Sequence, residues 1–137
     1  MGERTLYLAT YKSVALAEFS RHMKVDRSTG LLSGVLEREI YRLNLTLKAT
    51  LDLRNPKVCA ALARSDAPAC FFADKKIPRA IAAFIRGTTT VEAIIVPSIA
   101  FPDDMEKWCL VLLLEKLDPD YRSFISDVQE FGRFKVE

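Results

Sequence analysis

The chain has 137 residues, of which half are hydrophobic and five are glycine, a composition that fits a single folded domain over 1–137 and argues against disorder. Its 20 basic and 18 acidic residues leave a net charge of +2 without a basic stripe, so the composition does not favour nucleic acid as a partner. No apolar run reaches the roughly 20 residues of a membrane span and no signal-peptide pattern opens the chain, so we expect a cytoplasmic protein without a membrane partner.

The N-terminal part predicts three strands and a helix. Residues 5–9 are apolar and β-prone, which indicates a short strand. Residues 12–23 have helical spacing, and four apolar side chains fall on one face: Ala15, Leu16, Phe19 and Met23. Residues 26–34 are rich in Ser, Thr and Gly, which is typical of a loop. Residues 37–47 then show the alternation of a strand with one solvent face, and 49–53 predict another short strand.

Two further helices are predicted in the middle of the chain. Asn55 followed by Pro56 is a helix-start pattern, a capping residue before a first-turn proline, and the helix should run to about residue 63. Residues 66–74 read as a connection. Residues 76–86 form an amphipathic pattern that ends at Gly87, and four of its apolar side chains are expected to face inward: Ile77, Ile81, Phe84 and Ile85.

The C-terminal part predicts strands. Residues 91–96 and 108–114 are apolar and read as buried strands, and 125–136 would add a last edge strand. The elements come in a mixed order and two strand-to-strand connections are short. This favours an α+β fold, with a mainly antiparallel sheet and a few helices, over a regular βαβ repeat.

Cysteine and histidine usage limits the chemistry. The three cysteines, Cys59, Cys70 and Cys109, are far apart and odd in number, which fits neither a disulfide framework nor a zinc motif. We therefore expect three free thiols in a reducing compartment. A single histidine, His22, excludes a multi-histidine metal site and makes a Ser-His-Asp triad hard to build, so no metal is expected.

Three residues stand out by position, and each has a structural alternative. Tyr7 lies within an apolar strand, where a tyrosine is often a core aromatic with its hydroxyl bonded. Glu18 lies at the border of the apolar helix face and could instead pair with Arg21 or His22 on the helix surface. Ser98 follows a strand-ending proline, where it could point into a cleft or simply end a turn.

Three sequence blocks, in the right order and spacing, resemble the RES family. In residues 2–19 a Tyr-Leu-Ala strand leads to an Ala-Leu-Ala-Glu helix. In residues 77–100 a helix precedes a strand that ends in Val-Pro-Ser, and 108–113 resembles the closing strand of the family. The similarity runs from about residue 2 to residue 117.

The resemblance implies an ADP-ribosyltransferase-like fold and a bacterial toxin that consumes NAD, held inactive by an Xre-type helix-turn-helix antitoxin. It assigns the family's glutamate to Glu18, its serine to Ser98 and its active-site tyrosine to Tyr7. Tyr7 and Ser98 would also contact the NAD. The family's arginine lies upstream of the Tyr-Leu-Ala strand, in a segment that precedes Met1, so the domain is expected to be N-terminally short with an uncovered strand edge.

The implied reaction breaks the nicotinamide–ribose bond, by hydrolysis, phosphorolysis or ADP-ribosyl transfer. Glu18 would stabilise the positive charge that develops on the ribose, Tyr7 would stack on the nicotinamide or ribose, and Ser98 would hydrogen-bond the substrate. The alternative is a truncated, catalytically inactive RES domain that acts only as a protein-binding module, toward an antitoxin or a second copy of itself.

Overall fold

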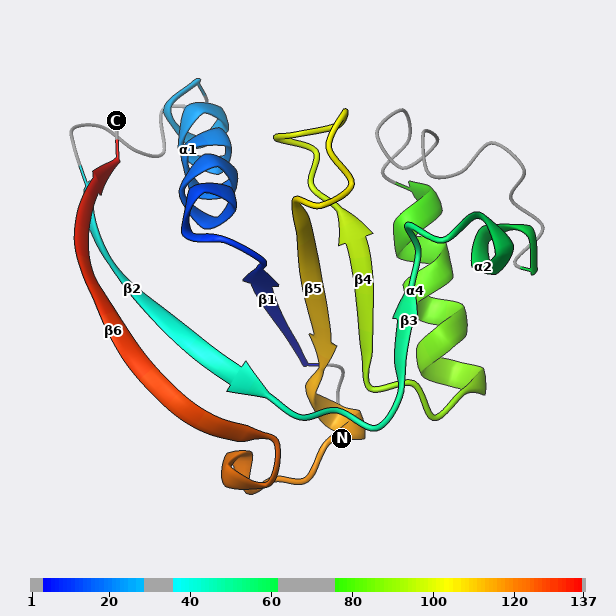
Figure 1. The fold of residues 1–137 in the computed structure, drawn as a ribbon. Coiled ribbons are helices and arrows are strands. Elements are labelled where there is room, and N and C mark those ends of the chain that lie inside the picture. The colour runs from blue at the N-terminus through cyan, green and yellow to red at the C-terminus, as the bar shows by residue number, and fades with distance from the viewer. Residues whose placement is uncertain (1–3, 29–35, 62–75, 137) are drawn as a thin grey trace.

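The computed structural model describes residues 4–28, 36–61 and 76–136, and it confirms the α+β prediction (Figure 1). Two short 3₁₀ helices, Leu114–Lys116 and Tyr121–Ser123, flank the connection into the last strand. The main elements follow one another as β1 (Thr5–Ala9), α1 (Lys12–Ser28), β2 (Leu36–Leu45), β3 (Thr50–Asp52), α2 (Pro56–Ala61), α4 (Lys76–Thr88), β4 (Ala93–Pro97), β5 (Trp108–Leu113) and β6 (Ile125–Val136).

The strands form two sheets. One has four strands in the order β1-β5-β4-β3, in which β5 runs antiparallel to both β1 and β4, and β3 runs parallel to β4. The other is a long two-stranded antiparallel ribbon of β2 and β6. The predicted mainly antiparallel arrangement is therefore confirmed. Among the described helices, none is both long and apolar enough to cross a membrane.

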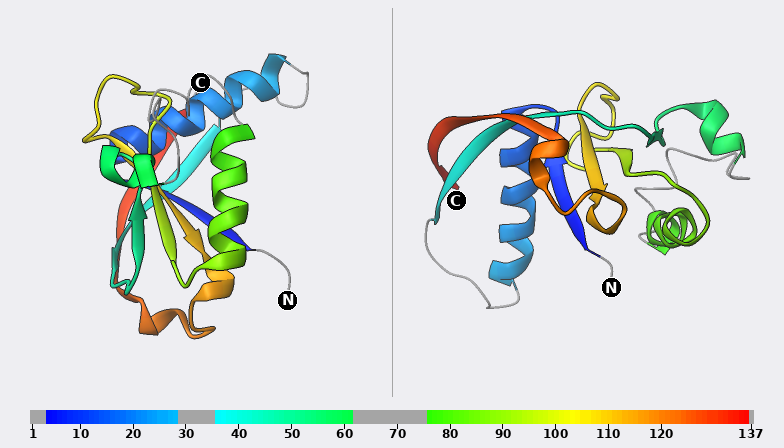
Figure 2. Two further views of the ribbon diagram at one scale, coloured as in Figure 1. Left: turned by 90° about the vertical axis from the view of Figure 1, so that its right-hand side faces the viewer. Right: turned by 90° about the horizontal axis from the view of Figure 1, so that it is seen from below.

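The four-stranded sheet has an apolar cluster on each face. On one face, Ile81 and Ile85 of α4 pack with Ile94 of β4 and Leu113 of β5. On the other face, Leu112 lies in a cluster that Leu45 and Leu47 help to cover, where the chain leaves the ribbon. Figure 2 shows the consequence: α4 covers one face of the sheet and the β2–β6 ribbon lies on the opposite side.

Some predicted boundaries and one predicted core position were wrong. The first helix continues to Ser28, through the start of the loop predicted at 26–34, and the rest of that loop lies outside the described residues, as does the connection at 66–74. Phe84 is 55% exposed instead of buried. The helical period placed it on an apolar arc, but Ile81 and Ile85, one turn apart, already fill the contact with the sheet.

The strand predicted at 91–96 begins at Ala93, and Glu92, directly before it, bonds to the segment that leads into β3. Its carboxylate accepts hydrogen bonds from the N–H groups of Lys48 and Ala49, at 2.6 and 3.2 Å. Its own N–H donates to the Ala49 carbonyl at 2.9 Å. These bonds fix where β3 enters the sheet beside β4.

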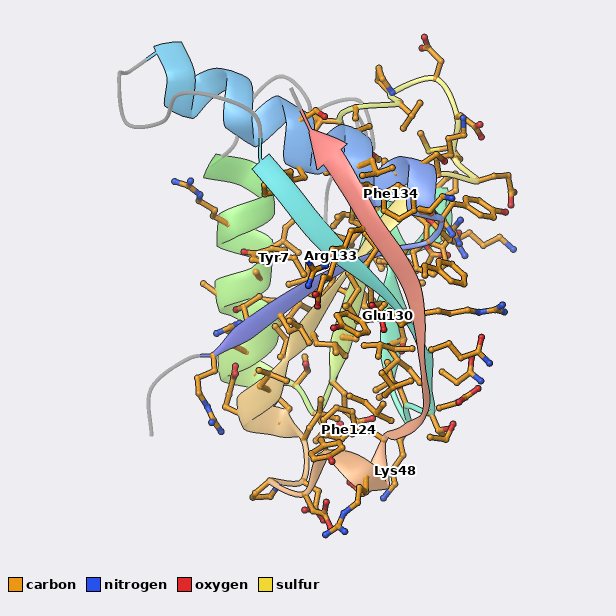
Figure 3. All side chains as sticks on the ribbon, turned by 90° about the vertical axis from the view of Figure 1, so that its left-hand side faces the viewer. Tyr7, Lys48, Phe124, Glu130, Arg133 and Phe134 are labelled. Atoms are coloured by element: carbon orange, nitrogen blue, oxygen red, sulfur yellow. The ribbon has the colours of Figure 1, made fainter. Side chains whose placement is uncertain are left out.

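The start of α1 is held between the sheet and the ribbon. The ammonium group of Lys12 lies 4.7 Å from the centre of the Phe134 ring of β6, and Figure 3 shows Phe134 beside the first turns of this helix. A cation over an aromatic ring is a favourable contact. The helix therefore begins at the junction of the two sheets, next to the end of β1.

Candidate functional site

The structure brings Glu18 and Ser98 into direct contact, although 80 positions separate them in the sequence. The Ser98 hydroxyl donates a hydrogen bond to Glu18 Oε1 at 2.5 Å. The N–H of Ala100 donates to the same carboxylate oxygen at 3.3 Å and to Ser98 Oγ at 3.2 Å. One oxygen of Glu18 is thus oriented by two donors from the segment that follows β4.

Glu18 reaches this position because of how α1 is anchored. Val14, in the first turn of the helix, is completely buried, and the C=O of Tyr11 accepts the N–H groups of Val14 and Ala15. Residues four apart in a helix lie on the same face. The buried face at Val14 therefore continues one turn later at Glu18, which is half-buried.

Ser98 is placed by the end of β4. Pro97, the last strand residue, has no N–H to donate and pairs with Trp108 of β5. The N–H of Ser98 donates to the Lys107 carbonyl at 3.2 Å, and its C=O accepts the N–H of Phe101 at 3.1 Å, which closes a tight turn. Ser98 is thus the first residue of a turn, whereas the structural alternative placed it at the end of one. Its side chain is 1% exposed and faces Glu18.

The thiol of Cys109 lies next to Glu18 and Ser98, and the sequence did not predict it as part of the site. In the sheet it lies between Ala9 of β1 and Val96 of β4. Burial raises the pKa of its thiol to about 11, with a further contribution from the charge of Glu18 that a hydrogen bond with Ser98 partly offsets. The thiol is therefore protonated at neutral pH and is no nucleophile. Only the strand register reveals this neighbour.

Tyr7 is not the core aromatic that the apolar strand suggested, because its side chain is 72% exposed. Strand residues two apart point to the same face about 7 Å from each other. Tyr7 is two residues before Ala9, the partner of Cys109, so it lies on the same sheet face as Cys109. In the part of the chain that the structure describes, the Tyr7 side chain makes no hydrogen bond. The Tyr7 ring is therefore exposed to solvent, on β1 and on the same sheet face as Cys109.

Arg4 lies at the opposite end of β1. Its C=O accepts the N–H of Leu114, and its own N–H donates to Glu115 Oε2 at 3.1 Å. The contact of Glu18 with Ser98 is near the other end, where Ala9 pairs with Cys109. Arg4 therefore does not add a cation beside the carboxylate.

Arg54 holds the segment between β4 and β5. It forms a forked ion pair with Asp52 at 2.8 and 2.9 Å, donates to the Met105 carbonyl at 2.8 Å and lies 5.2 Å from the centre of the Trp108 ring. Its hydrogen bonds lower the pKa of the Asp52 carboxyl. The guanidinium is thus engaged by a carboxylate and a carbonyl, and its effect on the site is indirect, through Met105 and Trp108.

Among the residues whose side chains are described, no group of three His, Cys, Asp or Glu lies close enough to hold a metal ion. The side chains of Arg21 and His22, the alternative partners of Glu18, lie outside the described side chains, and Cys70 lies outside the described residues altogether. What the described residues offer is a carboxylate held in one orientation by neutral donors, a protonated thiol beside it and an exposed aromatic ring on the same sheet face. Such an arrangement can stabilise a positive charge.

Comparison with protein-family models matches the RES domain over residues 1–132. No curated protein and no solved structure matches the chain significantly.

Proposed function

The chain belongs to the RES domain family, and on that premise we propose that it consumes NAD as the toxin of a toxin–antitoxin pair. The observation that carries the proposal is the contact of Glu18 with Ser98, which lie 80 residues apart in the sequence. The resemblance assigns the family's glutamate and serine to these two residues, and their contact supports that assignment. Toxicity through NAD loss would be exerted in the cytoplasm, where the cell keeps its NAD. An Xre-type helix-turn-helix protein would be the partner that restrains it.

The reaction we propose breaks the bond between ribose C1′ and the nicotinamide nitrogen. The bonding electron pair leaves with nicotinamide, which becomes neutral, and positive charge develops on C1′ and the ring oxygen of the ribose. A nucleophile then adds at C1′: water in hydrolysis, phosphate in phosphorolysis or an acceptor side chain in ADP-ribosyl transfer. The catalyst's main task is to stabilise the developing cation, for which a fixed carboxylate is suited.

Glu18 is the residue we assign to that task. Its Oε1 accepts from Ser98 and Ala100, which fixes the orientation of the carboxylate before the substrate arrives. A preoriented charge needs no reorganisation during the reaction, and this is where electrostatic catalysis gains most.

Ser98 acts through Glu18 in this proposal. We expected a direct hydrogen bond from Ser98 to the substrate, but its 1% exposure and its bond to Glu18 favour a positioning role. Tyr7, with 72% of its side chain exposed, is the better candidate for direct contact, by stacking on the nicotinamide or the ribose.

The alternative function, a protein-binding module, is supported by the outer edge of β1. The Arg4 backbone bonds to Leu114, directly after β5, and the Thr10 backbone bonds to Trp108 of β5. Because hydrogen bonding alternates along an antiparallel pair, the backbone groups of Thr5, Tyr7 and Ala9 point away from β5. No other strand among the described residues pairs with this edge. A free edge of this kind binds an extended segment of a partner by strand addition.

Product analysis separates the two functions. The purified chain is incubated with NAD at millimolar concentration, with and without phosphate, and the products are followed by proton NMR. Release of nicotinamide with ADP-ribose, with a phosphorylated ADP-ribose or with a modified protein supports catalysis and identifies the acceptor. A folded chain that leaves NAD intact, yet forms a stable complex with an Xre-type helix-turn-helix protein, would favour the binding module.

A further inference from the structure

Thr10 makes three hydrogen bonds with a single residue, Trp108. Its N–H and its hydroxyl donate to the Trp108 carbonyl at 3.0 and 2.5 Å, and the hydroxyl accepts the Trp108 N–H at 2.8 Å. In a regular antiparallel pair that N–H would go to the partner's carbonyl. Here the hydroxyl takes the carbonyl's place, so the chain stays tied to β5 while it turns out of the sheet.

We call these three hydrogen bonds between Thr10 and Trp108 the clamp. It lies between the segment that carries Glu18 and the segment that carries Ser98. On one side, α1 starts at Lys12 and carries Glu18. On the other side, Trp108 pairs with Pro97, directly before Ser98. The carboxylate of Glu18 and the hydroxyl of Ser98 thus approach each other from two segments that meet at the hydrogen bonds between Thr10 and Trp108.

A small change at the clamp would have a large effect at Glu18. Six residues along a helix correspond to about 9 Å, so a tilt of about 10° at Lys12 would move Glu18 by about 1.5 Å. A misplacement of about 1 Å can cost on the order of a hundredfold in rate. At this end of the helix, Val14 is buried and Lys12 contacts Phe134. The part-buried hydrogen bonds of Thr10 add a restraint on the chain directly before the helix begins.

We propose that Thr10 is a positioning residue for Glu18: its hydroxyl, clamped to the backbone of Trp108, sets the direction in which α1 leaves the sheet. Where activity is concerned, the inference rests on the NAD-cleaving function proposed above. The contact geometry itself does not depend on that function.

Three variants test the role. Thr10→Val removes the hydroxyl and keeps the branched shape, and Thr10→Ser restores the hydroxyl. Thr89→Val is the matched control, because the half-buried Thr89 hydroxyl also donates once, to the Ile85 carbonyl at 2.8 Å, and accepts once, from the Val91 N–H at 3.2 Å, at the far end of α4.

Two readouts are used. The first is the kcat and KM for NAD cleavage. The second needs no activity: the rate at which Cys109 is alkylated at pH 8, followed on its own peptide by mass spectrometry. Burial and the nearby Glu18 charge raise the pKa of this thiol to about 11. A shift of α1 would expose the thiol and move the Glu18 charge away from it. The pKa of Cys109 would then fall, and alkylation would become faster.

Thr10→Val is expected to lower kcat ten- to a hundredfold with KM within about twofold, and to alkylate Cys109 at least about threefold faster. Thr10→Ser and Thr89→Val should match the wild type in both readouts. The inference is overturned if Thr10→Val behaves like Thr89→Val, or if Thr10→Ser loses kcat; the serine variant decides alone if the valine variant does not fold. Should the wild type not cleave NAD, faster alkylation in Thr10→Val would still support the clamp while the proposed function fails.

Discussion

Ser98→Ala removes the hydroxyl that donates to Glu18 Oε1 at 2.5 Å, in a position that is only 1% exposed. Water cannot easily replace the lost donor at such a site. A hydrogen bond to a charged group contributes about 1.5–3 kcal/mol, and the Ala100 N–H remains as a second donor. We therefore expect the free energy of unfolding to fall by about 1.5–3 kcal/mol.

The assay is urea unfolding followed by circular dichroism, carried out on Ser98→Ala, Glu18→Ala and the double variant. If the two side chains stabilise each other, the cycle gives a coupling energy of about 1.5–3 kcal/mol, whereas independent sites add to within about 0.5 kcal/mol. Ser126→Ala is the control, because its exposed hydroxyl makes only a 3.5 Å contact, with the Asn44 carbonyl, and its effect should stay within about 0.5 kcal/mol. Additive effects of the Ser98 and Glu18 variants would refute the coupling.

Further outcomes follow from the ion pairs, the core and the thiols. Burial alone would raise the pKa of Glu115, but hydrogen bonds from backbone N–H groups, including that of Arg4, and the charge of Arg86, 3.2 Å away, lower it overall. The stabilising effect of Glu115 is therefore complete above its ordinary pKa of 4.5 and is lost as the pH falls through the lowered value. Glu115→Gln should weaken the loss of stability between pH 6 and about pH 3, measured by urea unfolding at each pH. An unchanged loss of stability over this pH range would contradict this. Leu112→Ala, at a completely buried position, should cost about 2–5 kcal/mol in urea unfolding, and an effect no larger than that of Leu6→Ala, at a position 37% exposed, would contradict the packing. Thiol titration of the denatured, unreduced protein should find all three cysteines free, and an internal disulfide would contradict the expected reducing compartment.

The strands and helices were predictable where the sequence pattern is local. Residues 5–9 and 125–136 fall at the bounds that the structure has, because apolar and alternating runs act over a few neighbours. Exposure was less predictable. Tyr7 has apolar neighbours, but β1 is an edge strand, so its side chain is 72% exposed; this depends on the order of the strands in the sheet.

The candidate site could not be predicted from spacing. Glu18 and Ser98 meet only because α1 starts at the end of β1 while β5 lies between β1 and β4. The order of strands in the sheet is not visible in any local sequence pattern. Glu18 and Ser98 were predicted as site residues together only through the resemblance to the RES family. Cys109 and Ala100 had no signal of their own, since a thiol and a backbone N–H acquire their roles from the register and the turn after Pro97.

The claim that Glu18 supplies the charge for NAD cleavage is tested most directly by the initial rate of nicotinamide release, compared between the wild type and Glu18→Gln at saturating NAD. Glutamine keeps the size and the hydrogen-bond acceptor for Ser98 and Ala100 but removes the negative charge. Loss of a preorganised electrostatic contact of this kind costs about a hundred- to a thousandfold in rate. We predict a decrease of that size, with unchanged circular dichroism and NAD affinity; equal rates in the two proteins would contradict the role of Glu18.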